Sequence, residues 1–379
     1  MKARPDNSCI VFLLTPWAKV KSNSSSVLIT GTLALVYMRR SKLLSPVELA
    51  PAELQALQRH GSDLGGCTAA LEVLDGSFLT HSISDGDSFW SFKHPTIGEA
   101  YAAILRKSPE LLGIYVQGTD VDKLMREVTC GDMQIQGAVI LPRSLFPLMA
   151  TRMRGFRGSS SYKSDHLSEW DARRQIRHFL AERCSTDFFE AYLRADPGVI
   201  EGIDRPGVYL EVNADIALAI RMHTHGMLPD AVRESLVSFA VECVKEGGDP
   251  RILVDASFRA LMTSEELSRL ENDIRTTLLP NIEEVRLAIQ ALHQEGEGDA
   301  AWHMRRFQQS LNGIADHFHT SRRIRTLVNR QTARTQEWIE LREQLAKKNR
   351  ESTSHAISVT GSSAENTVGS RSIFDDIAE

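Results

Sequence analysis

The fold expected for this chain is decided by one stretch, Phe89-Trp90-Ser91-Phe92-Lys93-His94-Pro95-Thr96-Ile97-Gly98-Glu99-Ala100-Tyr101. Its alternating aromatic residues predict a short strand, and a helix start follows at once. Pro95 suits the first helical position, where its missing N–H leaves no hydrogen bond unmade. Thr96 and Glu99 have the spacing of a capping box. We therefore expect a buried His94 at a strand–helix junction, able to hydrogen-bond a phosphate oxygen or, alternatively, a nearby carbonyl.

The flanking residues predict a winged-helix-like module over about 27–107. Val27–Met38 is apolar but too short and interrupted to span a bilayer, so we expect a buried helix there. Ser45-Pro46-Val47-Glu48 has the pattern of a helix start. Asp85-Gly86 predicts a hairpin turn between two strands. The predicted elements are helices at 27–38, 52–60, 67–74 and 144–154, strands at 77–82 and 89–93, and a strand or extended link at 137–142.

From Asp165 onward the pattern is almost entirely helical. A polar run rich in glycine and serine precedes it, so we assign 155–164 as a linker. Stacked helical hairpins without a fixed repeat are expected over 165–350. The expected fold class is thus mainly α, with a winged-helix-like module and a small β-hairpin followed by a helical array. The predicted helices of the array span 166–184, 186–196, 214–225, 229–246, 264–277, 281–293, 300–318 and 322–348.

The composition is typical of a cytoplasmic protein with two or three domains. The chain has 379 residues, 42% of them hydrophobic, and a net charge of −5 with a pI near 6.2. This acidic balance argues against a general binder of nucleic acids or acidic membranes. Five cysteines are too scattered for a zinc cluster or a disulfide framework. We expect an irregular or non-native leader at 1–26 and a mostly disordered tail at 351–379 with a short terminal motif.

Several motifs in a fixed order resemble one family of signalling proteins. They resemble the third class of novel STAND nucleoside triphosphatases, which are prokaryotic switches in signalling and antiphage defence. The resemblance covers about residues 27–154 and the last few residues, and it implies a regulatory region there. It also implies that the helical array after it is a sensor. The motifs that carry the resemblance are Trp90–Ile97, Leu111–Gly118, Glu127–Gly131 and Arg371–Ile377.

The resemblance implies a specific role for the strand–helix junction. In STAND proteins, a histidine at the winged-helix junction senses the terminal phosphates of the bound nucleotide and helps to hold the closed, inactive state. By resemblance, His94 is that nucleotide-sensing residue, and Lys93 adds positive charge beside it. ATP and Mg²⁺ are the cofactors of the intact family.

The chain departs from the family because it contains no Gly-Lys pair. A phosphate-binding loop needs that lysine together with backbone N–H groups and a Ser/Thr that holds Mg²⁺. No nucleophile elbow or other hydrolase signature stands out. We therefore expect a regulatory and sensor fragment of a truncated switch. It should have no catalytic residue, metal or cofactor of its own, no membrane association, and protein partners or self-association.

The last predicted helix supports an alternative function. Between Thr320 and Arg350, nine basic residues stand against three acidic ones, a local charge of +6. Such a helix can follow a phosphate backbone. Apolar residues such as Trp338 and Leu341 favour packing against neighbouring helices instead. The alternatives are thus a nucleic-acid-binding protein that uses the winged helix and this basic helix, or a helical scaffold in which His94 is structural. The candidate nucleic-acid contacts are Arg322, Arg323, Arg325 and Arg330.

Overall fold

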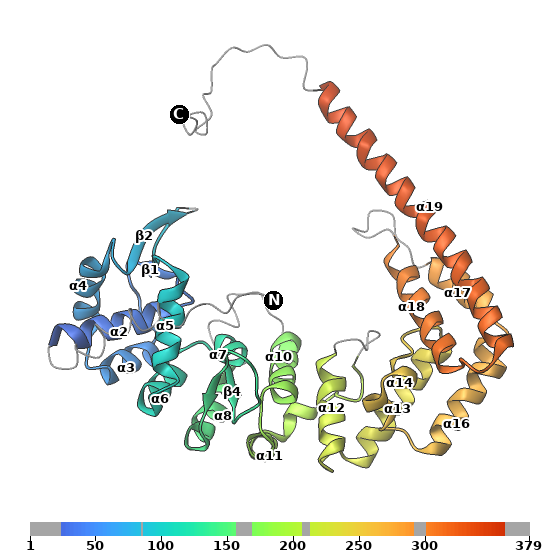
Figure 1. The fold of residues 1–379 in the computed structure, drawn as a ribbon, viewed down its shortest axis with the longest axis horizontal. Helices are drawn as coiled ribbons and strands as arrows, with labels where there is room; N and C mark the ends of the chain where they lie inside the picture. The colour runs from blue at the N-terminus through green and yellow to red at the C-terminus, as the bar shows by residue number, and fades with distance from the viewer. Residues whose placement is uncertain (1–23, 85, 157–168, 207–212, 292–300, 361–379) are drawn as a thin grey trace, which may run out of the picture. The chain divides into compact units, whose positions relative to one another are not determined.

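The computed structural model describes residues 24–84, 86–156, 169–206, 213–291 and 301–360. These residues are mainly helical and include a small antiparallel sheet, which confirms that part of the predicted fold class. The chain divides into two compact units (Figure 1). Unit 1 contains Met1–Ile203 and Val212–Leu228, and unit 2 contains Asp204–Glu211 and Pro229–Glu379.

Unit 1 begins with a helix, a strand, two helices and a β-hairpin. These elements are α2 (Ser24–Met38), β1 (Leu43–Ser45), α3 (Pro51–Arg59), α4 (Leu64–Leu74), β2 (Leu79–Ser84) and β3 (Asp87–Phe92). The strands form an antiparallel sheet in the order β1-β3-β2. Leu43 lies opposite Trp90, and the hairpin register runs from Leu79 opposite Phe92 to the turn. The predicted buried helix and the predicted hairpin are therefore confirmed.

The helix start expected at Ser45 is wrong. Ser45 ends β1, and the next helix begins at Pro51. Its N-cap is Ala50, whose side chain has no oxygen to accept a hydrogen bond. The carboxylate of Glu53 instead accepts a hydrogen bond from the N–H of Ala50 at 2.8 Å. This reverse half of a capping box is enough to begin the helix without a polar N-cap side chain.

Helix α4 begins earlier than predicted and packs closely on α2. Gly65 and Gly66 lie inside α4 rather than before it. A Cβ at Gly66 would come within 2.6 Å of the Leu28 side chain, so glycine allows the two helices to approach. The N-cap of α4 is Asp63, whose side chain accepts from the Gly66 N–H at 2.7 Å.

The other described elements of unit 1 are helical apart from two short strands that pair in parallel. Val128 lies opposite Val139, and both side chains are buried. The strand predicted within 137–142 is therefore confirmed. The elements are α5 (Pro95–Leu105), α6 (Pro109–Gly118), α7 (Val121–Glu127), β4 (Val128–Cys130), β5 (Val139–Leu141), η1 (Arg143–Leu145), α8 (Phe146–Gly155), α10 (Glu169–Glu182), α11 (Thr186–Ala195), η3 (Pro197–Ile200) and α12 (Ala214–Thr224).

The two units do not divide at the predicted linker 155–164. Helices α8 and α11, which lie on either side of it in the sequence, both belong to unit 1. They pack through Phe146 and Phe188, whose rings meet edge-on with centroids 5.1 Å apart. Residues 157–168, which include most of that linker, lie outside the described part of the chain.

The described elements of unit 2 are all helical. The predicted helices between 229 and 348 are confirmed with boundaries that shift by a few residues, except that the last one continues to Thr360. Helices α18 and α19 run antiparallel, because Arg305 pairs with Glu343 and Gln308 pairs with Gln336. The elements are α13 (Asp230–Lys245), α14 (Arg251–Val254), α15 (Ala256–Arg259), α16 (Ser264–Asp273), the π-helical turn η4 (Ile274–Leu278), α17 (Ile282–Ala291), α18 (Trp302–His317) and α19 (Arg322–Thr360).

The helix α19 corrects the start expected for the tail. It continues through Thr360, whereas we expected a mostly disordered tail from 351. Residues 349–360 contain no glycine or proline that would end a helix, and Gly361 comes directly after its last residue. Residues 361–379, which include the predicted terminal motif, lie outside the described residues, as do residues 1–23 of the predicted leader.

Candidate functional site

His94 lies at the junction between β3 and α5, where it is the N-cap of the helix. Its backbone is extended, with φ −142° and ψ 141°, and Pro95 takes the first helical position. The His94 Nδ1 accepts a hydrogen bond from the Thr96 N–H at 3.3 Å and lies 2.8 Å from the Thr96 Oγ1. The predicted capping box is wrong, because Thr96 and Glu99 lie inside the helix and histidine supplies the cap.

The imidazole of His94 is exposed, which corrects the expectation of a buried ring. Because Nδ1 accepts the Thr96 N–H, the neutral ring carries its proton on Nε2. Within the described part of the chain, Nε2 has no hydrogen-bond partner. The ring therefore presents a single N–H donor to solvent. This donor lies at the N-terminus of a helix of 11 residues, where the helix dipole favours anions.

Lys93 is exposed beside His94 but is already engaged. Its Nζ donates a hydrogen bond to the Gly76 carbonyl oxygen, in the turn that follows α4. Its backbone N–H donates to the Phe78 carbonyl oxygen at 3.0 Å. Lys93 thus links the end of β3 to the turn before β2. These two hydrogen bonds stabilise the backbone that precedes His94.

Three tyrosines fix the helix that His94 caps. The ring of Tyr37 on α2 lies 5.0 Å from that of Tyr101 on α5 and 5.7 Å from that of Tyr115 on α6, measured between centroids. Tyr101 and Tyr115 are buried. Large aromatic side chains contribute much of the burial energy of a core, so this cluster holds α5 against its neighbours.

A carboxylate and a lysine complete the tyrosine cluster. Glu127 accepts hydrogen bonds from the Tyr115 hydroxyl at 2.6 Å and the Tyr37 hydroxyl at 3.1 Å. Lys123 donates to the same carboxylate, and its Nζ lies 4.4 Å from the centroid of the Tyr37 ring. Burial, and then the charge of Glu127, raises the pKa of both Tyr37 and Tyr115, so both hydroxyls remain donors at neutral pH. Burial lowers the pKa of Lys123.

Sequence reasoning missed this cluster. Tyr37 and Glu127 are 90 residues apart, and each lies in an apolar or mixed helix with no distinguishing spacing. The side chains satisfy one another, so the cluster is a structural support of the junction rather than a reactive site.

An open pocket of about 580 Å³ lies beside β1 and the turn between β2 and β3. Its charged lining residues are Arg39, Glu48 and Asp87. The guanidinium of Arg39 is already hydrogen-bonded to the carboxylate of Glu53 at 2.6 Å. Neither Lys93 nor His94 lines this pocket, so the pocket and the junction are separate features of unit 1.

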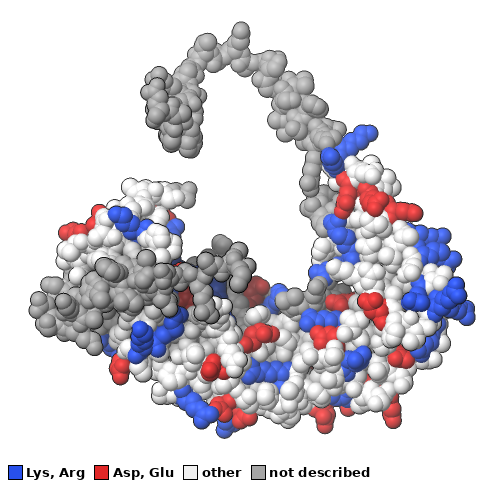
Figure 2. All heavy atoms as spheres, in the orientation of Figure 1, with Lys and Arg blue, Asp and Glu red and all other residues white. Residues whose placement is uncertain are grey.

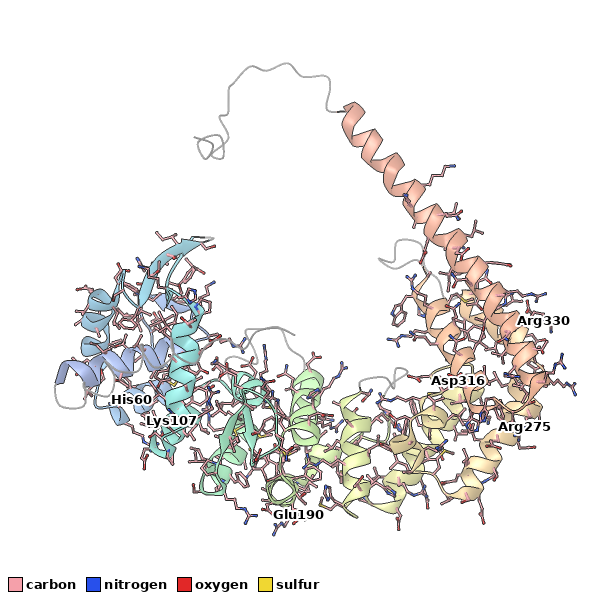
Figure 3. The ribbon with its side chains drawn as sticks, in the orientation of Figure 1. His60, Lys107, Glu190, Arg275, Asp316 and Arg330 are labelled. Atoms are coloured by element: carbon pink, nitrogen blue, oxygen red, sulfur yellow. The ribbon has the colours of Figure 1, made fainter. Side chains whose placement is uncertain are left out.

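The four arginines predicted as nucleic-acid contacts lie on the first turns of α19 in unit 2. All four are exposed, and Figure 3 labels Arg330 among them. None of their guanidinium groups has a hydrogen bond or ion pair with any residue that the structure describes. Figure 2 shows Lys and Arg side chains gathered on the flank of α19 where Figure 3 labels Arg330. The four predicted arginines are Arg322, Arg323, Arg325 and Arg330.

The opposite face of α19 packs against its neighbours, as the amphipathic pattern predicted. Ile324, Val328 and Ile339 are buried. The expectation that Leu341 and Leu345 pack against neighbouring helices is wrong, because these side chains are 54% and 44% exposed. They come near the start of α18, where the antiparallel pairing of the two helices ends at Arg305 and Glu343.

In the residues that the structure describes, no group of three His, Cys, Asp or Glu side chains is placed to hold a metal ion. No helix in the described part of the chain is both long enough and apolar enough to cross a membrane. Comparison with models of known families, with curated proteins and with solved structures finds no match to this chain. A functional assignment must therefore start from the residues and their geometry.

Proposed function

We propose that the chain is the regulatory and sensor part of a STAND-type nucleotide-dependent switch, and that α2 to β3 form its winged-helix module. One observation carries this proposal. The element order is helix, strand, two helices and a β-hairpin, and the first strand pairs with the last in the order β1-β3-β2. The motif that resembles the family, Trp90–Ile97, spans the end of that hairpin and the junction with α5.

The surface of the proposed winged helix favours a protein partner over DNA. A helix that enters a DNA groove needs cationic side chains to neutralise phosphates. Helix α4 and the strands β2 and β3 contain no lysine or arginine. Their exposed residues include two large apolar side chains, Val73 at 71% and Ile83 at 75% exposure. Exposed apolar residues of this kind suit contact with another protein domain.

The geometry of His94 is compatible with phosphate sensing. Its Nδ1 is used to cap α5, which orients the ring and leaves the Nε2–H as an outward donor. A nucleotide held by another domain or another chain would meet this donor beside the positive end of the helix dipole. In this proposal Lys93 stabilises the junction through its hydrogen bond to the Gly76 carbonyl oxygen, and His94 donates the hydrogen bond to the phosphate.

The chain itself supplies no hydrolysis in this proposal. ATP and Mg²⁺ would be bound by the nucleotide-binding core of the whole switch, because a phosphate-binding loop requires a Gly-Lys pair that this sequence lacks. The helices from α10 onward would recognise the protein trigger, as such arrays do in the family that the sequence resembles.

Calorimetric titration of ATP with Mg²⁺ into the purified chain tests whether the nucleotide site lies outside this chain. The proposal predicts no saturable binding by the chain alone. Mg²⁺-dependent binding with a Kd below about 10 μM, or hydrolysis of ATP, would contradict it, because the binding free energy of about −7 kcal/mol would require a nucleotide site within the chain.

A further inference from the structure

The arginines at the start of α19 are a cluster of exposed guanidinium groups on one helix. Most other described arginines hydrogen-bond to carboxylate, amide or backbone carbonyl oxygens or lie against aromatic rings, and those without such a described contact, Arg154, Arg205 and Arg269, are scattered over different elements. The guanidinium groups of Arg322, Arg323, Arg325 and Arg330 make no such contact with any described residue, although the helix that carries them is firmly packed through Ile324 and Val328. Arginines with described hydrogen-bond partners include Arg39, Arg59, Arg106, Arg126, Arg152, Arg177, Arg183, Arg221, Arg233 and Arg286.

Positive charge is concentrated in the first half of α19. From Arg322 to Gln336 the helix carries five arginines and no acidic residue, and the first acidic residue is Glu337. Like charges repel, so such a run costs free energy unless a partner or counterions compensate it. Arg334 is the one residue of the five with a described ion pair, to Glu283 at 2.7 Å, and its side chain is still 49% exposed.

The arrangement of these arginines suits a chain of phosphates. At about 100° per residue, Arg323, Arg330 and Arg334 lie within about 40° of one another around the helix, and Arg322 and Arg325 extend the positive charge over the rest of its exposed side. They are separated by about 10 Å and 6 Å along its axis, and a nucleic-acid strand carries a phosphate about every 3.4 Å of its axis. The guanidinium fork matches the geometry of phosphate oxygens.

The neighbouring side chains decide between a nucleic acid and an acidic protein. Protein interfaces are usually anchored by apolar or aromatic residues at their centre. The exposed residues between these arginines are Thr326, Asn329 and Ala333, which include no large apolar side chain. Hydroxyl and amide groups are common donors to phosphates and sugars.

We propose that the arginine face of α19, defined by Arg322, Arg323, Arg325 and Arg330, binds the phosphate backbone of a nucleic acid without reading its sequence. This inference is independent of the proposed switch function, because it concerns unit 2 and needs neither the winged helix nor His94. The absence of exposed aromatic side chains on this face argues against base stacking, so the contacts are to phosphates.

The test is fluorescence anisotropy with the full chain and labelled 20-nucleotide DNA, single-stranded and duplex, each in two unrelated sequences. Between about 50 and 200 mM salt, binding should weaken with a slope of about −3 to −4 in the logarithms if four phosphates are neutralised. The two sequences should bind with equal affinity. The variant R322Q/R323Q/R325Q/R330Q should bind at least about tenfold more weakly and lose most of the salt slope.

A matched variant controls for total charge. K107Q/R154Q/R205Q/R269Q removes the same number of positive charges at exposed positions outside α19 and should retain the affinity of the wild type. Both variants should keep the wild-type thermal unfolding profile, since glutamine is a good helix former and all the sites are exposed. The proposal is overturned by no binding at 50 mM salt, by equal losses in the two variants, or by equally tight binding of poly-glutamate, which would indicate an acidic protein partner.

Discussion

Arg177 in unit 1 and the arginine face of α19 in unit 2 have opposite surroundings. In unit 1, Arg177 is buried and donates to the Asp215 carboxylate at 2.9 Å, the Val199 carbonyl oxygen at 2.7 Å and the Glu201 carbonyl oxygen. In unit 2, the arginine face of α19 is exposed, and its guanidinium groups have no hydrogen bond or ion pair with a described residue. Arg177 therefore joins three segments of unit 1, whereas the guanidinium groups of the arginine face remain available to a ligand. The number of basic residues therefore does not predict where a ligand binds. Whether each guanidinium already has a partner within the protein is the better guide.

The largest effect is expected where the arginine is buried. Arg177→Ala would leave the Asp215 carboxylate without its buried partner and would remove the side-chain donor to the Val199 carbonyl oxygen. Breaking a buried ion pair on one side costs about 3–5 kcal/mol. We expect a loss of that size in the free energy of unfolding, measured by urea denaturation followed by circular dichroism. A loss below about 1 kcal/mol would show that Arg177 does not hold these segments together.

A smaller loss is expected in the tyrosine cluster that supports the junction. Glu127→Ala removes the shared acceptor of Tyr37, Tyr115 and Lys123. Leaving buried donors unsatisfied costs about 1–3 kcal/mol, so we expect about 2 kcal/mol in the same urea experiment. Glu127→Gln retains an acceptor and should cost less than Glu127→Ala. Equal losses for the two variants would argue against the hydrogen bonds as the cause.

The half-buried His60 at the C-terminal end of α3 should make unit 1 sensitive to acid; Figure 3 labels this residue. Burial, and then the charge of Arg59, lowers its pKa to about 4. In the unfolded chain a histidine has a pKa of about 6.5, so below that pH the unfolded state binds a proton that the folded state does not. The contribution of His60 is therefore complete above pH 6.5 and is lost as the pH falls towards 4.

Urea denaturation at pH 7 and pH 5 measures this effect. The wild type should lose more stability than His60→Gln over this interval, because glutamine does not titrate. Should the two proteins lose the same amount of stability, His60 is not the group responsible.

The smallest effect on stability is expected at the arginine face of α19. Arg322→Ala or Arg325→Ala should change the free energy of unfolding by less than about 0.5 kcal/mol, as is usual for exposed positions without partners. A loss above about 1 kcal/mol for either variant would show that these arginines have a structural role, and the comparison with Arg177 would fail.

The helices could be predicted because their signals are local. Helix α16 begins at the expected place because Thr263 and Glu266 form the capping box that their spacing predicts. The hairpin was predictable from Asp85-Gly86 between two alternating runs. The strand β1 was not, because it has only three residues and pairs with residues about 45 positions away, such as Phe89 opposite Leu44.

The surroundings of the candidate site could not be predicted from local patterns. The position of His94 between a strand and a helix followed from Pro95 and the aromatic alternation. The packing of the helix that His94 caps depends on Tyr37, whose ring meets that of Tyr101 from 64 positions away in the sequence. Contacts such as Arg177 with Asp215 join residues 38 positions apart, and no sequence spacing marks them.

The central claim is that this chain is the regulatory part of a STAND-type switch. Reading about a kilobase of DNA upstream of the Met1 codon in all three frames tests it most directly. The account predicts a Gly-Lys-Ser/Thr phosphate-binding loop after a hydrophobic strand, followed by a strand that ends in two carboxylates. An unrelated gene or a promoter in that region would contradict the claim, and a scaffold or a nucleic-acid-binding protein would then be the better account.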